Sequence, residues 1–156
     1  MNKRALKNHL KYIVPEYKLA LIKESGVEPQ VIRCPEDVER LLEPLKHYAE
    51  EHFVSLHLDS KHHVVGYQIV SRGTLNASLV HPREVFKAAI LSNSFALIVA
   101  HNHPAGSLKP SAEDIETTET LIKAGKILGV SLLDHVVVSS NGSTSIREAR
   151  PDLWSG

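Results

Sequence analysis

A short apolar segment that runs directly into a pair of histidines is the feature that most limits how this chain can fold. Residues 96–100, ALIVA, have the length and composition of a buried strand, and His101 and His103 follow at once. A proline and a glycine then favour a turn, and residues 111–128 repeat apolar side chains at helical spacing. The pattern therefore predicts a strand, a tight turn and a helix in succession.

Strand-like and helix-like segments alternate along the rest of the chain. Strands are expected where apolar residues alternate with polar ones or cluster, and helices where apolar residues recur every three or four positions. The predicted strands are 17–23, 53–59, 64–73, 96–100, 135–140 and 143–146, with a polar turn at 60–62, and the predicted helices are 35–49, 82–93 and 111–128. Together they predict an α/β fold in which one mixed sheet packs against two or three helices.

The length of the chain bounds its domain organisation. With 156 residues, 42% of them hydrophobic, the chain can bury the core of one domain. Residues 3–11 are locally basic, and we expect residues 1–15 to form a flexible N-terminal segment. The domain itself is expected over 16–150, with a C-terminal tail at 151–156.

Charge and hydropathy exclude some classes of partner. Eighteen basic residues balance eighteen acidic ones, so the net charge favours neither nucleic acid nor an anionic membrane as a partner. No apolar stretch reaches the length of a membrane span, and the N-terminus lacks the apolar block of a signal peptide. The cytoplasm is therefore the expected location. Cys34 is the only cysteine, so no internal disulfide is expected.

The two histidines have the spacing of a metal site. Side chains two apart on a strand share a face, so His101 and His103 are expected to project the same way. Neutral imidazole nitrogens bind zinc at about 2.0–2.1 Å, and Asp114, in the first turn of the next helix, can supply a third ligand. Three protein ligands leave one tetrahedral position open, as in catalytic zinc sites.

Each of these residues also has a simpler interpretation. Ser111 and Asp114 have the S-x-x-D spacing of a helix capping box, and paired histidines beside a turn are often only solvated. The combination of a buried strand, both histidines, a tight turn and a carboxylate at a helix start favours the metal site. His135, beside Asp134, could orient a metal ligand or be a hydrogen-bonded histidine at a strand start. His81 is expected to be the entrance residue of the helix that follows it.

The motif as a whole resembles that of a known family. His101, His103, Pro104, Ser111 and Asp114 stand as H-x-H-P, six residues, S, two residues, D, which resembles the JAMM metal signature of the JAB/MPN-domain metallopeptidases. Within that superfamily the chain is most similar to the RadC-like proteins, from about residue 16 to 148, through AHNHPAG, PSAED, GTLNASLVHPREVFKAAI and AGKILGVSLLDHVVV. Longer RadC proteins carry an N-terminal helix-hairpin-helix-like region, which a chain of this length is not expected to hold.

The resemblance implies a fold, a cofactor and an activity. The fold would be JAB/MPN-like, which is cytidine-deaminase-like, and Zn²⁺ would be bound by His101, His103 and Asp114. Glu51 would be the general base, with its neighbour Glu50 as the alternative, and Ser111 would donate a hydrogen bond to the oxyanion. A serine hydroxyl that faces the metal could not sit equally well over its own helix, so the capping and oxyanion roles of Ser111 compete.

The function implied is zinc-dependent hydrolysis of an amide or isopeptide bond in a peptide or protein conjugate. Two alternatives remain open, a non-catalytic MPN-type scaffold and an accessory protein of DNA repair or recombination. The neutral charge argues against nucleic acid as a partner, although the family association leaves it open. No membrane partner is expected, and the sequence leaves a homo-oligomer open.

Overall fold

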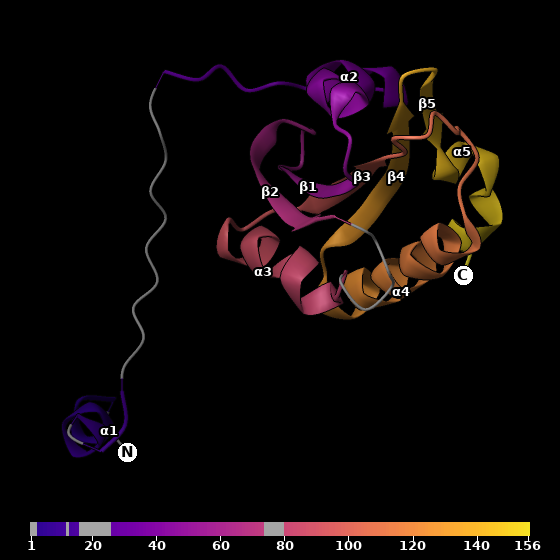
Figure 1. Ribbon diagram of the computed structural model, residues 1–156. Coiled ribbons are helices and arrows are strands. Elements are labelled where there is room, and N and C mark those ends of the chain that lie inside the picture. The colour runs from indigo at the N-terminus through magenta and orange to yellow at the C-terminus, as the bar shows by residue number, and fades with distance from the viewer. Residues whose placement is uncertain (1–2, 12, 16–25, 74–79) are drawn as a thin grey trace.

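One mixed sheet organises the domain. The computed structural model describes residues 3–11, 13–15, 26–73 and 80–156. Within them, five strands are ordered β2-β1-β3-β4-β5 across the sheet (Figure 1). The strands are β1 (His52–Leu58), β2 (Val64–Arg72), β3 (Ala96–Asn102), β4 (Ser131–Ser139) and β5 (Gly142–Ser145). Only β3 and β4 run parallel; the other neighbouring pairs are antiparallel. The predicted α/β class and mixed sheet are confirmed, while the strand predicted at 17–23 lies outside the described residues.

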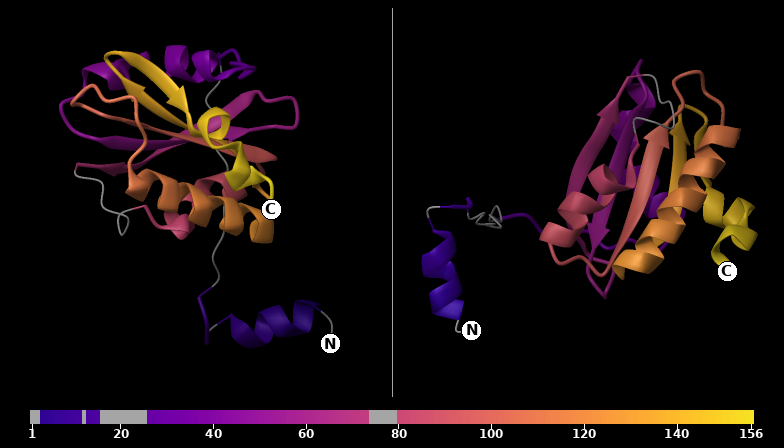
Figure 2. Two further views of the ribbon diagram at one scale, coloured as in Figure 1. Left: turned by 90° about the vertical axis from the view of Figure 1, so that its right-hand side faces the viewer. Right: turned by 90° about the horizontal axis from the view of Figure 1, so that it is seen from below.

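Helices cover both faces of the sheet (Figure 2). The helices of the domain are α2 (Pro35–Leu41), the 3-10 helix η1 (Glu43–His47), α3 (Pro82–Leu91), α4 (Ala112–Leu128), α5 (Ile146–Ala149) and the 3-10 helix η2 (Pro151–Trp154). On one face, side chains of α3 and α4 such as Phe86 and Leu121 pack with Phe53 and Val99 of the sheet. On the other, α2 and η1 pack over alternate residues of the same strands. Strand residues therefore point alternately into two separate cores.

The β3-α4-β4 segment places the end of a buried strand beside the start of a helix. All of β3 is buried, and it pairs with both β1 and β4. Ser111 caps the N-terminus of α4, and Gly129 ends the helix with φ 71°, a left-handed conformation that glycine adopts without strain. Polar groups at the carboxyl ends of parallel strands commonly form ligand sites. The two histidines and Asp114 lie at this end of the sheet.

Three predicted elements differ from the observed ones. The strand predicted over 135–140 begins four residues earlier, at Ser131, so His135 lies within β4 and not at its start. The helix predicted over 35–49 is broken: α2 ends at Leu41 and a 3-10 turn follows, because Pro44 has no N–H to continue the α-helical hydrogen bonds. The strand predicted over 143–146 ends at Ser145, whose Oγ accepts the N–H of Glu148 and starts α5.

Both ends of the described chain are helical. Near the C-terminus, η2 is fixed to the sheet because the indole Nε1–H of Trp154 donates to the carbonyl of Leu132 at 2.8 Å. At the other end, α1 (Lys3–Leu10) buries none of its residues and lies apart from the sheet in Figure 1. Among the residues that the structure describes, no helix combines the length and apolarity needed to cross a membrane.

Candidate metal centre

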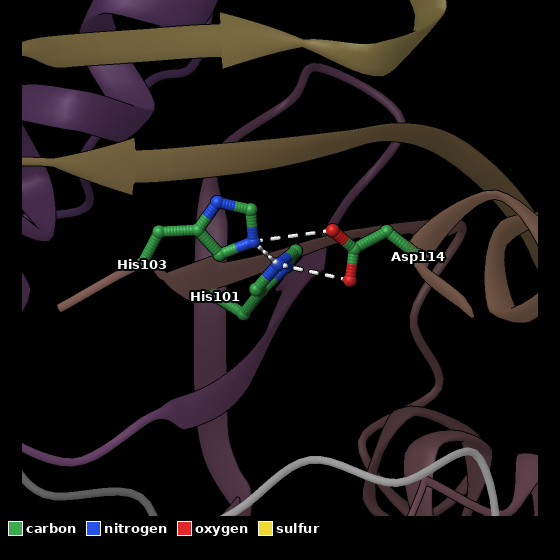
Figure 3. Close-up of side chains that lie close together, drawn as sticks. All are labelled: His101, His103 and Asp114. Atoms are coloured by element: carbon green, nitrogen blue, oxygen red, sulfur yellow. Dashed lines mark hydrogen bonds and ion pairs between the residues drawn. The ribbon is translucent and has the colours of Figure 1, made fainter. Parts of the chain in front are cut away.

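Three side chains from neighbouring elements converge on one point (Figure 3). His101 is the penultimate residue of strand β3, His103 directly follows the strand, and Asp114 comes from the first turn of α4. The two Nε2 atoms are 2.9 Å apart, His101 Nε2 is 3.1 Å from Asp114 Oδ1, and His103 Nε2 is 3.1 Å from Asp114 Oδ2. The three residues that the sequence suggested as ligands thus lie together in the structure, and the cluster can hold a metal ion.

The distances between these donor atoms fit a metal ion with tetrahedral coordination. Donors bound at about 2.0–2.1 Å in tetrahedral geometry lie about 3.3 Å from one another, close to the separations in the cluster. His101 is fully buried and Asp114 is 8% exposed, so the ligands are held by packing as well as by their own hydrogen bonds. The donor set of two nitrogens and one carboxylate oxygen is one that zinc accepts.

The charges within the cluster stabilise one another. Burial alone would raise the pKa of Asp114, but the close imidazoles of His101 and His103, each 3.1 Å from the carboxylate, hold it well below its usual value. The pKa of His103 is raised, chiefly by its hydrogen bond with Asp114. A carboxylate that stays ionised against two imidazoles attracts a positive charge, which a proton or a metal ion can supply.

Nδ1 of each imidazole, the ring nitrogen that faces away from the cluster, also has a hydrogen-bond partner. Nδ1 of His103 donates to the carbonyl of Ser107 at 3.0 Å, which directs Nε2 toward the cluster. Nδ1 of His101 lies 2.8 Å from Nε2 of His135, whose own Nδ1 lies 2.7 Å from the hydroxyl of Thr118. His135 is therefore both a buried, fully hydrogen-bonded histidine and a contact of His101, so the structure is compatible with both interpretations, although the residue lies within β4 and not at a strand start.

Ser111 forms the complete capping box with Asp114. Its Oγ accepts the N–H of Asp114 at 3.1 Å, and its own N–H donates to Oδ2 of Asp114 at 2.8 Å. In this arrangement the hydroxyl acts as an acceptor, so its proton is not used by the cap. Because the cap uses Ser111 Oγ as an acceptor, it does not compete with the hydroxyl for hydrogen-bond donation.

Glu51 lies directly before β1. It is half-buried, its carbonyl accepts the N–H of Gly73 at 2.9 Å, and its charge is among the causes that raise the pKa of His103. Glu50 is exposed. Of the two glutamates considered as the base, Glu51 is thus the one whose charge acts on the cluster.

Asn102 is a site residue that the sequence did not single out. It lies between the two histidines, so its side chain points to the opposite side of the strand, where it is 1% exposed. Its Oδ1 accepts the N–H of His52 at 2.7 Å, and its Nδ2 donates to the carbonyl of Glu50 at 3.0 Å. Asn102 therefore holds the backbone on both sides of Glu51. The sequence signal that could have pointed to Asn102 was its position as a polar residue between two candidate ligands at the end of an apolar segment.

The remaining candidates have structural roles. Nδ1 of His81 accepts the N–H of Arg83 at 3.0 Å and caps α3, as expected of an entrance residue. Asp134 accepts hydrogen bonds from Ser145 Oγ and from the N–H of Arg147, so it fixes the start of α5.

Comparison with known proteins identifies the family of the chain. The model of the RadC-like JAB domain matches residues 32–151. A UPF0758 protein of Desulforamulus reducens is 48% identical over 118 residues, which is 75% of this chain and 52% of that protein. A UPF0758 protein of Methanosarcina mazei is 41% identical over 139 residues, which is 87% of this chain and 61% of that protein.

The chain belongs to the RadC-like JAB domain family. The JAB/MPN-like fold expected from the resemblance is therefore confirmed, and the resemblance to RadC-like proteins with it. The RadC-like JAB domain makes up most of the chain, which spans about half the length of the curated relatives that it matches.

Proposed function

We propose that this RadC-like domain is a zinc-dependent hydrolase that cleaves an amide bond in a peptide or an isopeptide-linked conjugate. The observation that carries the proposal is the convergence of two imidazole nitrogens and a carboxylate, within about 3 Å of one another, at the end of a buried strand. A zinc ion bound there would supply Lewis acidity, lowering the pKa of a coordinated water and polarising the scissile carbonyl.

Each residue of the site then has a task. His101, His103 and Asp114 hold the ion. Glu51, whose backbone is fixed through Asn102, takes a proton from the attacking water and passes it to the leaving amine. Ser111, whose hydroxyl proton is not used by the helix cap, donates a hydrogen bond to the oxyanion.

Replacing either glutamate by glutamine tests which of them is the general base. Glu51→Gln and Glu50→Gln are compared on a panel of peptide and isopeptide substrates after zinc loading is verified. We expect Glu51→Gln to lower the hydrolysis rate by about 10²- to 10⁴-fold with its zinc content unchanged, and Glu50→Gln to hydrolyse like the native protein.

The same pair separates the enzyme from a non-catalytic scaffold. If the native protein binds zinc but hydrolyses no member of the panel faster than Glu51→Gln does, the scaffold interpretation replaces the hydrolase. A larger loss for Glu50→Gln than for Glu51→Gln would move the role of base to the neighbouring residue.

A further inference from the structure

We propose that Thr118 and His135 fix His101 in the tautomer that binds a metal, with the proton on Nδ1 and the lone pair on Nε2. This inference rests on the proposed metal site, and it assigns a positioning role to two residues that lie behind it. Neither residue touches the point at which the ligands converge. Both act through His101.

The three side chains form an unbroken chain of short contacts. Thr118 Oγ1 is 2.7 Å from the carbonyl oxygen of Asp114, four residues earlier in α4. The same hydroxyl is 2.7 Å from Nδ1 of His135, and Nε2 of His135 is 2.8 Å from Nδ1 of His101. Thr118, His135 and His101 each have no exposed surface, so water does not compete for these bonds.

The hydrogen bond of Thr118 determines which atom donates in each of the other hydrogen bonds. The carbonyl of Asp114 can only accept, and the Thr118 hydroxyl has a single proton, so that proton is directed to the carbonyl. The hydroxyl oxygen must then accept from Nδ1–H of His135.

The remaining two bonds follow from the first. A neutral imidazole carries one N–H, so with Nδ1 of His135 protonated its Nε2 is an acceptor. The partner nitrogen, Nδ1 of His101, must therefore be the donor. Nε2 of His101 is left with its lone pair, and this is the atom that faces His103 and Asp114.

Apart from its two hydrogen-bond partners, the side chain of His135 is enclosed by the protein interior. The ring is fully buried and packs edge-on against Phe53, with ring centroids 5.4 Å apart. The described contacts of its two nitrogens are the Thr118 hydroxyl and His101, neither of which is an anion. A charge on His135 would thus be buried with no anion in hydrogen-bond contact with either ring nitrogen.

Asp114 consequently serves the site twice. Its carboxylate is a ligand of the cluster, and its main-chain carbonyl orients the Thr118 hydroxyl and, through it, both histidines. With the opposite polarity, His101 would present an N–H to a cation, and affinity for a metal would fall without any change of fold. Partners of this kind typically change metal affinity by about 10- to 100-fold.

The test uses three threonine substitutions in α4. Thr118→Val removes the hydroxyl at nearly constant volume, Thr118→Ser keeps it, and Thr120→Val is the matched control. Thr120 makes the same hydrogen bond to the carbonyl four residues earlier, at 3.0 Å, but is exposed. Zinc affinity is measured by competition with a chromophoric chelator, and folding of each variant by circular dichroism.

We expect Thr118→Val to bind zinc about 10- to 100-fold more weakly than the native protein, with Thr118→Ser and Thr120→Val close to native. The tautomer is read directly from two-bond ¹H–¹⁵N correlation spectra of the native, metal-free protein in alkaline buffer, where His101 should carry its proton on Nδ1. Thr118→Val affinity equal to that of Thr120→Val, or a native His101 protonated on Nε2, overturns the inference.

Failure of the proposed function gives a different result. If the native protein binds no zinc, the hydrolase proposal fails, and the tautomer spectrum alone decides the role of Thr118 and His135. That spectrum needs no metal and no substrate, and it does not depend on a substituted protein folding.

Discussion

Ser111 and Asp114 hold each other at the start of α4: the Ser111 N–H donates to Oδ2 of Asp114 at 2.8 Å, while Ser111 Oγ accepts the Asp114 N–H at 3.1 Å. The carboxylate that faces the two histidines is therefore also a helix cap. Its position is set by the helix terminus before any ion binds, which reduces the conformational freedom that binding must remove.

Replacing Ser111 by alanine should separate these two roles. Ser111→Ala removes the side-chain half of the capping box but keeps the main-chain hydrogen bond to Asp114, so we expect the free energy of unfolding to fall by about 1 kcal/mol with zinc still bound. Under the proposed function the hydrolysis rate should also fall by about 10²- to 10³-fold. Urea unfolding and zinc content measure the first two effects. Ser111→Thr keeps the hydroxyl and should restore stability; an alanine variant as stable as the native protein would show that the cap contributes nothing.

The local sequence patterns predicted much of this region because they depend on short-range rules. The buried strand at 96–100, the H-x-H spacing and the helix over 111–128 follow from periodicity and capping, and the structure has all three. The capping box and the metal cluster were considered as alternatives, yet one carboxylate makes both sets of contacts.

Longer-range contacts could not be predicted in the same way. Asn102 and His135 are defined by partners 50 and 34 residues away, and only the sheet brings these partners together. The break in the helix predicted over 35–49 was, by contrast, readable from the sequence, because Pro44 stands inside the segment. The signal for α5 was also local, a serine followed three residues later by a glutamate.

Asn102 should be needed for activity more than for metal binding. In Asn102→Asp a carboxylate would face the carbonyl of Glu50, which now accepts from the amide, so the segment carrying Glu51 would be displaced. We expect a loss of about 1–3 kcal/mol of stability and a lower kcat with zinc content retained. Asn141→Asp, the same change at an exposed residue that donates to Gly106, is the control. A normal kcat in folded, zinc-loaded Asn102→Asp would remove the positioning role of Asn102.

The domain should lose stability in acid through His57. This side chain is 2% exposed, contacts Ser55 Oγ at 3.0 Å, and burial lowers its pKa to about 4. The unfolded chain takes up a proton near pH 6.5 and the folded chain only near pH 4, so stability is complete above pH 6.5 and declines as the pH falls between these values. At about 1.4 kcal/mol per pKa unit, the loss approaches about 3 kcal/mol.

Denaturant unfolding between pH 7 and pH 4 measures this slope. His57→Gln should flatten it, leaving the part due to His135, whose pKa is also held well below its usual value by burial. His62→Asn, at an exposed turn position with φ 63°, should keep the native slope. Equal slopes in the two variants would contradict the assignment to His57.

Gly125 should resist a substitution that usually stabilises helices. A Cβ at this position in α4 would lie 2.5 Å from the carbonyl oxygen of Val130 and 3.3 Å from the nitrogen of Leu132, both main-chain atoms. The gain in helix propensity is about 1 kcal/mol, whereas forcing atoms into a packed contact costs about 1–3 kcal/mol. We therefore expect Gly125→Ala to lower Tm. At Gly66 the contact that an added Cβ would make among the described residues is with His57 Nδ1, at an ordinary 3.6 Å, so Gly66→Ala should change Tm less. A stabilised Gly125→Ala would show that α4 can shift away from β4.

The central claim is that His101, His103 and Asp114 bind one zinc ion, and elemental analysis of purified protein tests it most directly. After exposure to excess zinc and removal of unbound metal, the native protein should contain one zinc per chain and His103→Ala almost none. His47→Ala, at an exposed histidine paired with Glu43 outside the cluster, should match the native protein. Equal zinc content in the native protein and His103→Ala would contradict the account.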